Sequence, residues 1–217
     1  FFPILSQLWE NPPQSVGVLY IAPLKSLIND QFYRMEELLD LSGIPVYHWH
    51  GDVGASHKTK LLKDPSGILQ ITPESLESML MNRSNDIPRL FHDLRYVVID
   101  EIHTLMGTDR GNQIICQINR IENVIGRKPR RIGLSATVGE PELAAEWLSA
   151  GTHRSTDISE LPKEKIRWRI GMEHFYIQND EHDQSKQSAE KESFTQRSQI
   201  DSGYEYIYDC VKDKKSL

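Results

Sequence analysis

The chain has 217 residues, of which 38% are hydrophobic and 26% charged, a mix typical of a globular protein rather than a fibrous or disordered one. With 31 acidic and 25 basic residues its net charge is −6, which argues against a passive binder that holds nucleic acid by bulk positive charge, although local contacts stay possible. No apolar run approaches the roughly 20 residues that cross a bilayer, so we expect no membrane partner, and the start of the chain does not resemble a signal peptide. The two cysteines, Cys116 and Cys210, have no metal-ligand spacing, which excludes a zinc ribbon and favours a reducing, cytoplasmic setting.

Short β-rich runs alternate with helical periodicity between residues 16 and 136. In chain order the pattern predicts a helix at 1–8, a strand at 16–21, a helix at 24–39, a strand at 45–49, a helix at 55–63, a strand at 67–72, a helix from Pro73, a strand at 95–100, a helix at 114–125, a strand at 131–136 and a helix at 142–148. Strands that alternate with helices predict an α/β fold, in which helices cover both faces of a parallel sheet.

The composition changes after this α/β domain, which we assign to residues 1–150. Residues 151–178 hold two further predicted strands and form either a strand-rich end of the domain or a connector. Residues 179–217 begin with few apolar side chains, which predicts a flexible linker followed by the start of a helix. The first helix lacks an N-cap and a start methionine, so we expect a fold truncated at its N-terminus.

Two carboxylates stand at the end of the apolar strand predicted at 95–100, and ligands of parallel α/β sheets bind at the carboxyl ends of strands. Asp100 and Glu101 are followed by His103. One carboxylate can hold Mg²⁺ together with substrate phosphates, and a second can accept a proton from an attacking water. Taken alone, an Asp-Glu pair is better explained as a helix cap.

Other strand ends carry small hydroxyl groups or helix starts. Ser135 and Thr137 close the strand at 131–136, where hydroxyl groups can hydrogen-bond a neighbouring carboxylate. Two helix starts have backbone amides suited to binding anions, and a Gly-Asp turn lies between them in the sequence. The residues of these three segments are Pro23, Lys25, Gly51, Asp52, Thr72, Pro73, Glu74 and Ser75. Taken one at a time, these segments are more often simple caps or ordinary loops.

Together and in this order, the segments resemble the motor core of the superfamily-two helicases, the DEAD/DEAH-box group. The stretches APLKSLINDQ, ITPESLE, DEIHTLMGTDRG and LSATVGEPELAAEWL look most like the large helicase-related proteins and their Ski2-like relatives. The resemblance covers about residues 16–148. It implies a RecA-like parallel sheet and an ATP-dependent enzyme that uses ATP and Mg²⁺.

The resemblance also implies a role for each matching residue. Asp100 would hold the Mg²⁺ of the nucleotide, and Glu101 would position the attacking water. His103 would couple the nucleotide site to Ser135 and Thr137. The nucleic-acid face, which fixes register without reading sequence, would comprise Pro23, Lys25, Gly51, Asp52, Thr72, Pro73, Glu74, Ser75, Arg110 and Gly111.

The chain departs from the family because it contains no phosphate loop ending in Gly-Lys-Thr or Gly-Lys-Ser. We therefore expect a fragment of the first motor domain with little ATPase activity of its own, joined in cis to a second RecA-like domain in the longer protein. That protein is expected to couple ATP hydrolysis to movement on DNA or RNA, or to unwinding. The alternatives are a nucleic-acid-binding scaffold that has lost the motor, and the translocation subunit of a restriction or repair nuclease.

Three other features have simpler interpretations. His48 and His50 are spaced like metal ligands, but without an evident third ligand a solvated pair is the simpler prediction. The basic run at 127–131 could touch phosphate, although a helix C-terminus attracts such charges and a solvated loop explains them as well. Trp147 is most simply a core residue.

Overall fold

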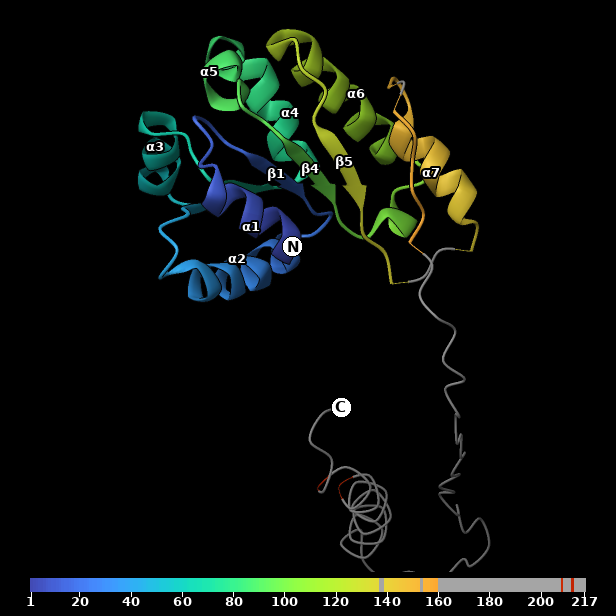
Figure 1. Ribbon diagram of the computed structural model, residues 1–217, viewed down its shortest axis with the longest axis horizontal. Helices are drawn as coiled ribbons and strands as arrows, with labels where there is room; N and C mark the ends of the chain where they lie inside the picture. Colours follow the sequence, from blue (N-terminus) through green and yellow to red (C-terminus); the bar gives the residue numbers. More distant parts are fainter. Residues whose placement is uncertain (137–138, 153, 160–207, 209–211, 213–217) are drawn as a thin grey trace, which may run out of the picture. The chain divides into compact units, whose positions relative to one another are not determined.

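A parallel sheet of five strands, in the order β2-β3-β1-β4-β5, lies at the centre of the part of the chain that is described (Figure 1). Its strands are β1 (Val18–Ile21), β2 (Val46–Trp49), β3 (Ile68–Ile71), β4 (Tyr96–Ile99) and β5 (Arg130–Gly133). Each of them overlaps a predicted strand. The parallel α/β sheet expected from the sequence is therefore confirmed.

The structure, a computed structural model, describes residues 1–136, 139–152, 154–159, 208 and 212. The chain divides into a first unit, Phe1–Glu160, which contains the sheet, and a second unit, Leu161–Leu217. The strands predicted between 165 and 178 and the linker that begins at 179 lie outside the described residues. Thr137 lies outside them as well.

The helices follow the strands in the predicted alternation. They are α1 (Phe2–Glu10), α2 (Lys25–Leu39), α3 (Ala55–Lys63), α4 (Pro73–Asn82), α5 (Ile87–Phe91), α6 (Asp109–Ile125) and α7 (Pro141–Ser149), with short 3₁₀ helices η1 (Ser84–Asp86) and η2 (Ile102–Thr104). The sequence pattern does not predict α5, because five residues are too few to show helical periodicity. Within the described ranges, no helix has the length and apolar character needed to span a membrane.

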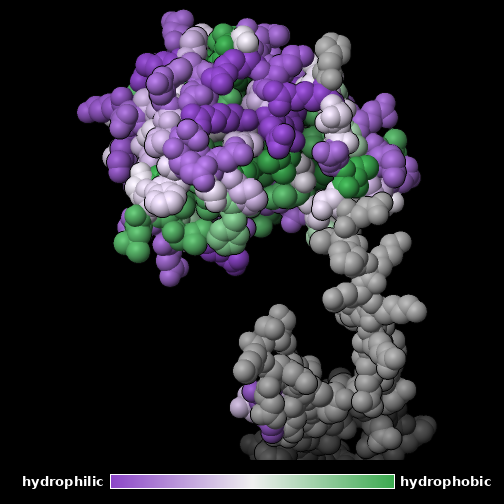
Figure 2. All heavy atoms as spheres, in the orientation of Figure 1, coloured by the Kyte–Doolittle hydropathy of each residue, from purple (hydrophilic) through white to green (hydrophobic). Residues whose placement is uncertain are grey.

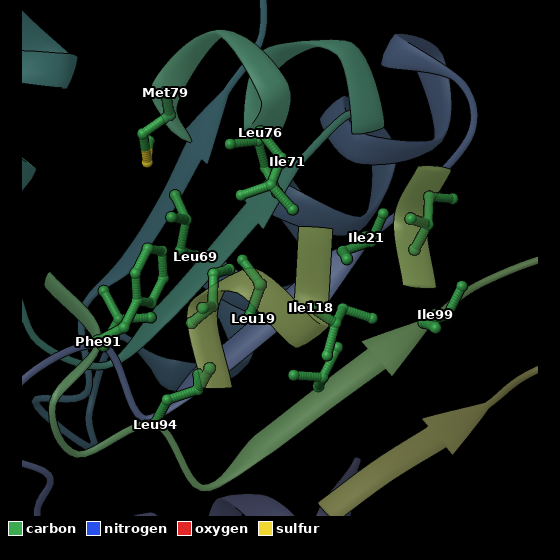
Figure 3. Close-up of a cluster of buried hydrophobic side chains, with 14 of the residues drawn as sticks. Leu19, Ile21, Leu69, Ile71, Leu76, Met79, Phe91, Leu94, Ile99 and Ile118 are labelled. Atoms are coloured by element: carbon green, nitrogen blue, oxygen red, sulfur yellow. The ribbon is translucent and has the colours of Figure 1, made fainter. Parts of the chain in front are cut away.

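The two faces of the sheet are buried against different helices, as Figure 1 shows. Side chains alternate along a strand, so Val18 and Tyr20 of β1 pack with residues of α1 and α2. Leu19 and Ile21 face the other way and pack with residues of α4 and α6, in the cluster drawn in Figure 3. Because both faces are covered, the central strands β1, β3 and β4 are largely apolar, whereas β5 at the end of the sheet begins with two arginines.

The register of the strands brings the residues that follow them to one edge of the sheet. Ile21 of β1 lies between Ile71 of β3 and Ile99 of β4. Beyond that row, the backbone amide of Asp100 donates to the carbonyl of Ile21 at 2.9 Å. The backbone amide of Leu134 donates in turn to the carbonyl of Ile99 at 2.9 Å. This carboxyl edge is where the sequence predicts the site.

Candidate functional site

The Asp100 carboxylate is fixed in place by two hydrogen bonds. Its Oδ1 accepts from the backbone amide of Glu101 at 2.9 Å, and its Oδ2 accepts from the hydroxyl of Tyr20. Burial, together with the hydrogen bond to Asp100, raises the pKa of Tyr20, so the phenol keeps its proton and acts as the donor. The side chain of Asp100 is thereby oriented at the end of β4.

Sequence reasoning missed Tyr20, because a tyrosine in a buried strand looks like an ordinary core residue. The signal lies in the register. Tyr20 pairs with Val98, and Asp100 stands two residues further along, on the same face of the sheet as Val98. A phenol on β1 can therefore reach a carboxylate at the end of β4.

Glu101 has a left-handed backbone conformation, with φ 52° and ψ 44°. For a residue other than glycine this conformation costs about 1–2 kcal/mol. Its Oε2 is buried and accepts no hydrogen bond within the described part of the chain. The strained backbone thus holds a carboxylate oxygen that accepts no hydrogen bond of good geometry, although the Nδ1 of His103 lies 3.2 Å from it.

His103 connects the end of β4 with the end of β5. Its Nδ1 lies 2.9 Å from the Oγ of Ser135, at hydrogen-bonding distance, and 3.2 Å from the Oε2 of Glu101. The backbone amide of Ile102 also donates to the carbonyl of Leu134 at 3.0 Å. The structure therefore brings together Glu101, His103 and Ser135, three of the residues that the sequence assigns to one site.

These residues fit a magnesium ion that is held mainly by a nucleotide. No cluster of three or more metal-ligating side chains occurs within the described ranges. Mg²⁺ does not need one, because it commonly takes one or two carboxylates and fills its other positions with phosphates and water. The oriented carboxylate of Asp100 and the unbonded Oε2 of Glu101 are oxygen donors of the required kind.

The start of α2 meets the Gly51-Asp52 turn at the same edge of the sheet. The Nζ of Lys25 lies 3.0 Å from the Oδ2 of Asp52, and both side chains are exposed. The hydrogen bond from Lys25 lowers the pKa of Asp52, so this carboxylate is ionised at neutral pH. Two segments that are separate in sequence thus form one exposed, polar surface.

Arg110 joins two of the predicted segments to α6. Its Nε donates to the Oε1 of Glu74 at 2.7 Å, and its Nη2 donates to the carbonyl of Pro23 at 2.7 Å. Burial alone would raise the pKa of Glu74, but the hydrogen bond and charge of Arg110 together with a backbone hydrogen bond outweigh burial and lower that pKa. Arg110 therefore holds the starts of α2 and α4 in a fixed relation, a role that its sequence position did not reveal.

The remaining predicted residues have local structural contacts. Thr72 is the N-cap of α4, where its Oγ1 accepts from the amide of Ser75 at 3.4 Å and donates to the Oγ of Ser75 at 3.0 Å, and Pro73 opens the helix. Gly111 is buried where a Cβ would overlap the carbonyl of Leu105. These contacts explain why such residues stand there, and their predicted contacts with nucleic acid stay predictions.

The histidine pair differs from its simpler interpretation. His50 is only 3% exposed, and its Nε2 is 2.8 Å from the Oδ1 of Asn29. His48 packs edge-on against Phe32, with 4.0 Å between ring centroids. Burial lowers the pKa of both histidines. The prediction of a solvated pair is therefore wrong for His50, which is buried, whereas His48 is half-buried against α2.

Comparison with known proteins adds a family and several relatives. Residues 1–145 match the DEAD/DEAH box helicase family. The chain is 34% identical over 171 residues to the "ATP-dependent helicase Lhr-Core protein 2" of Thermococcus barophilus, a match that covers 70% of this chain and 20% of that protein. It is 29% identical to the "ATP-dependent DNA helicase Hel308" of Methanococcus vannielii, over 91% of this chain and 24% of that protein.

A solved helicase structure is also similar to this chain. The structure of Mycobacterium smegmatis helicase Lhr bound to ssDNA and AMP-PNP aligns with a TM-score of 0.57 and 30% identity, over 66% of this chain and 20% of that one. The chain thus spans between a fifth and a quarter of the length of these three relatives.

Proposed function

This chain belongs to the DEAD/DEAH box helicase family, and from that premise we propose that it is part of the first motor domain of an ATP-dependent helicase or translocase. Its parallel sheet is a RecA-like domain of the superfamily-two type. We assign residues 1–150 to the motor domain, and a second RecA-like domain in cis would complete the motor. The reducing setting favoured by the two cysteines supports a cytoplasmic location.

One observation carries this proposal: the oriented carboxylate of Asp100 and that of Glu101, whose Oε2 accepts no hydrogen bond, stand side by side at the end of β4, and His103 lies between Glu101 and Ser135. Asp100 would hold Mg²⁺, which supplies charge neutralisation at the phosphates when it is bound. Glu101 would orient a water toward the γ-phosphorus of ATP and take its proton as the bond to the leaving ADP oxygen breaks. His103, which lies beside Glu101 and Ser135, would couple a change at Glu101 to Ser135 after β5.

The proposed partner is a DNA or RNA strand held by its backbone. Support comes from the exposed surface formed by Lys25 and Asp52, and from the start of α4, which Arg110 ties to the start of α2. Contacts of this kind fix position without reading sequence. Single-stranded DNA is the first probe to use, since it is the ligand in the solved structure of the Mycobacterium smegmatis relative.

The test uses the complete protein that contains this chain, with Glu101→Gln as the variant. We expect ATP turnover to fall by at least about a hundredfold, because the proton acceptor is lost, while nucleotide binding persists. Glu142→Gln is the matched control, since Glu142 is exposed on α7. Unchanged turnover in Glu101→Gln would remove Glu101 from its role, and a complete protein without turnover would be a scaffold instead of a motor.

A further inference from the structure

A second polar feature lies at the other edge of the sheet, away from Asp100. A pocket of about 350 Å³ is lined by seven residues, of which five are basic: Arg95, Arg127, Lys128, Arg130 and Arg154. Arg95 directly precedes β4, whereas Asp100 directly follows it. At about 3.3 Å per residue, the two positions are roughly 16 Å apart along the strand. The pocket is therefore separate from the candidate nucleotide site.

The local fold explains why these basic residues come together. Helix α6 ends at Ile125 and is capped by Gly126, whose φ of 66° turns the chain back toward the sheet. Four residues later β5 begins, and the backbone amide of Arg130 donates to the carbonyl of Arg95 at 2.8 Å. The Nζ of Lys128 donates to the carbonyl of Gly151 at 3.1 Å, which ties this loop to the segment that carries Arg154. Three segments that are distant in sequence thus contribute to one pocket.

The positive charge of this basic pocket is only partly balanced. Asp93 pairs with Arg95 at 2.8 Å and with Arg127 at 2.9 Å. No ion pair with a carboxylate of the described residues neutralises Lys128, Arg130 or Arg154. Since the whole chain has a net charge of −6, this excess of positive charge is a local feature and not a general one.

The charge of the C-terminal end of α6 does not account for the basic pocket. A helix C-terminus attracts cations within its last turn, which explains Arg127 and Lys128. Arg95, Arg130 and Arg154 come from two strand starts and a later segment, outside that turn. Crowded like charges repel one another, so the arrangement is best stabilised by an anion.

We propose that the basic pocket binds the phosphodiester backbone of a nucleic-acid strand, at a contact distinct from the Lys25 surface. Guanidinium groups, which four of the five basic residues carry, match the oxygens of phosphate. Only Leu94 and Pro129 add apolar surface, which is too little for the buried core that a protein partner needs. Figure 2 shows hydrophilic side chains gathered over the region where Figure 1 draws the starts of β4 and β5.

The experiment measures binding of a fluorescent single-stranded oligonucleotide of about 15 nucleotides to this chain by anisotropy, over a range of salt concentrations. The variant is Arg130→Gln with Arg154→Gln; both side chains are exposed and form no ion pair among the described residues, so the fold should persist. The control is Lys60→Gln with Lys63→Gln, an equal charge change in the last turn of α3. We plot the logarithm of the association constant against the logarithm of the salt concentration, which gives a negative slope. We expect this slope to become shallower by about 1.4 in the variant only, since each lost phosphate contact removes about 0.7.

Several outcomes would overturn the proposal. An unchanged slope in the variant, or an equal change in the control, would mean that the basic pocket holds no strand. Poly-glutamate is measured as a second probe. If the Arg130→Gln, Arg154→Gln variant lost binding of poly-glutamate but kept binding of the oligonucleotide, the basic pocket would be a site for acidic protein segments. Tripolyphosphate is measured as a third probe. If the same variant lost binding of tripolyphosphate alone, the basic pocket would be a site for small phosphates. A Lys25→Gln arm separates this inference from the proposed function, because each variant tests a different surface.

Discussion

Asp100 and Glu101 are neighbours in sequence, yet the backbone gives their carboxylates different surroundings. Asp100 accepts hydrogen bonds from Tyr20 and from the amide of Glu101, so its position is fixed. Glu101 has a left-handed backbone and a buried Oε2 without a hydrogen bond in the described structure. A fixed carboxylate suits a metal ligand, and a carboxylate oxygen that accepts no hydrogen bond suits a proton acceptor. The family resemblance implies different roles for the two residues, and these roles stay predictions.

Tyr20→Phe tests the residue that orients Asp100. The change removes one hydroxyl and leaves the ring in its buried position, so we expect a free energy of unfolding lower by about 2 kcal/mol, typical of a lost hydrogen bond to a charged group. Chemical denaturation of this chain measures it, with Tyr33→Phe as the control because Tyr33 is 66% exposed. Equal stability of the two variants would show that Tyr20 does not hold Asp100.

Among the elements, Asp93 ties together segments that the sequence does not show to be neighbours. Its carboxylate accepts hydrogen bonds from Arg95, from Arg127 after α6 and from the backbone amide of Gln14. Burial alone would raise the pKa of Asp93, but these hydrogen bonds outweigh it and hold the pKa at about 2. The loop after α5 is thereby fastened to the segment after α1 and to the start of β4.

Asp93→Asn should lower stability in a pH-dependent way. A carboxyl with a folded pKa of about 2 and an unfolded value of 3.8 contributes about 2 kcal/mol above pH 4, and this contribution disappears as the pH falls from about 4 to about 2. The variant should therefore be less stable at pH 7 and lose less stability over that acid range. Thermal unfolding from pH 2 to 7 measures both effects. Asp40→Asn at the exposed end of α2 is the control, and parallel curves for wild type and Asp93→Asn would contradict the assignment.

The sequence pattern predicts the elements better than the contacts between them. Buried parallel strands such as β1 are continuous apolar runs, which stand out in the sequence. The helix α5 is too short to show a period, and the bonds of Arg110 to Pro23 and Glu74 depend on a tertiary arrangement that no local pattern encodes. The burial of His50 against Asn29 was missed for the same reason.

For the whole molecule, the described sheet and helices correspond to one part of longer relatives. The chain spans between a fifth and a quarter of the three relatives described above. It carries the carboxylates at the end of β4, but its sequence contains no Gly-Lys-Thr or Gly-Lys-Ser to hold the phosphates of a nucleotide. Under the proposed function, this chain supplies the carboxylates, and another part of the complete protein supplies the groups that hold the phosphates.

The isolated chain should therefore hydrolyse ATP no faster than its Glu101→Gln variant, with or without single-stranded DNA. The reason is that a proton acceptor does not accelerate the reaction unless the phosphates are held in line with the water. A phosphate-release assay on the 217-residue chain measures this. Turnover that DNA stimulates would mean that these residues hold the triphosphate without a phosphate loop.

At residue 101 the left-handed backbone sets the stability of the fold against the proposed role of the carboxylate. Glycine has no Cβ and tolerates this conformation, so a descendant that no longer needed the reaction would gain stability by exchanging glutamate for glycine. A homologous protein that keeps glutamate at this position would then be under continuing selection for catalysis. Replacement of the glutamate by glycine would be an early genetic sign that the ATPase activity had been lost.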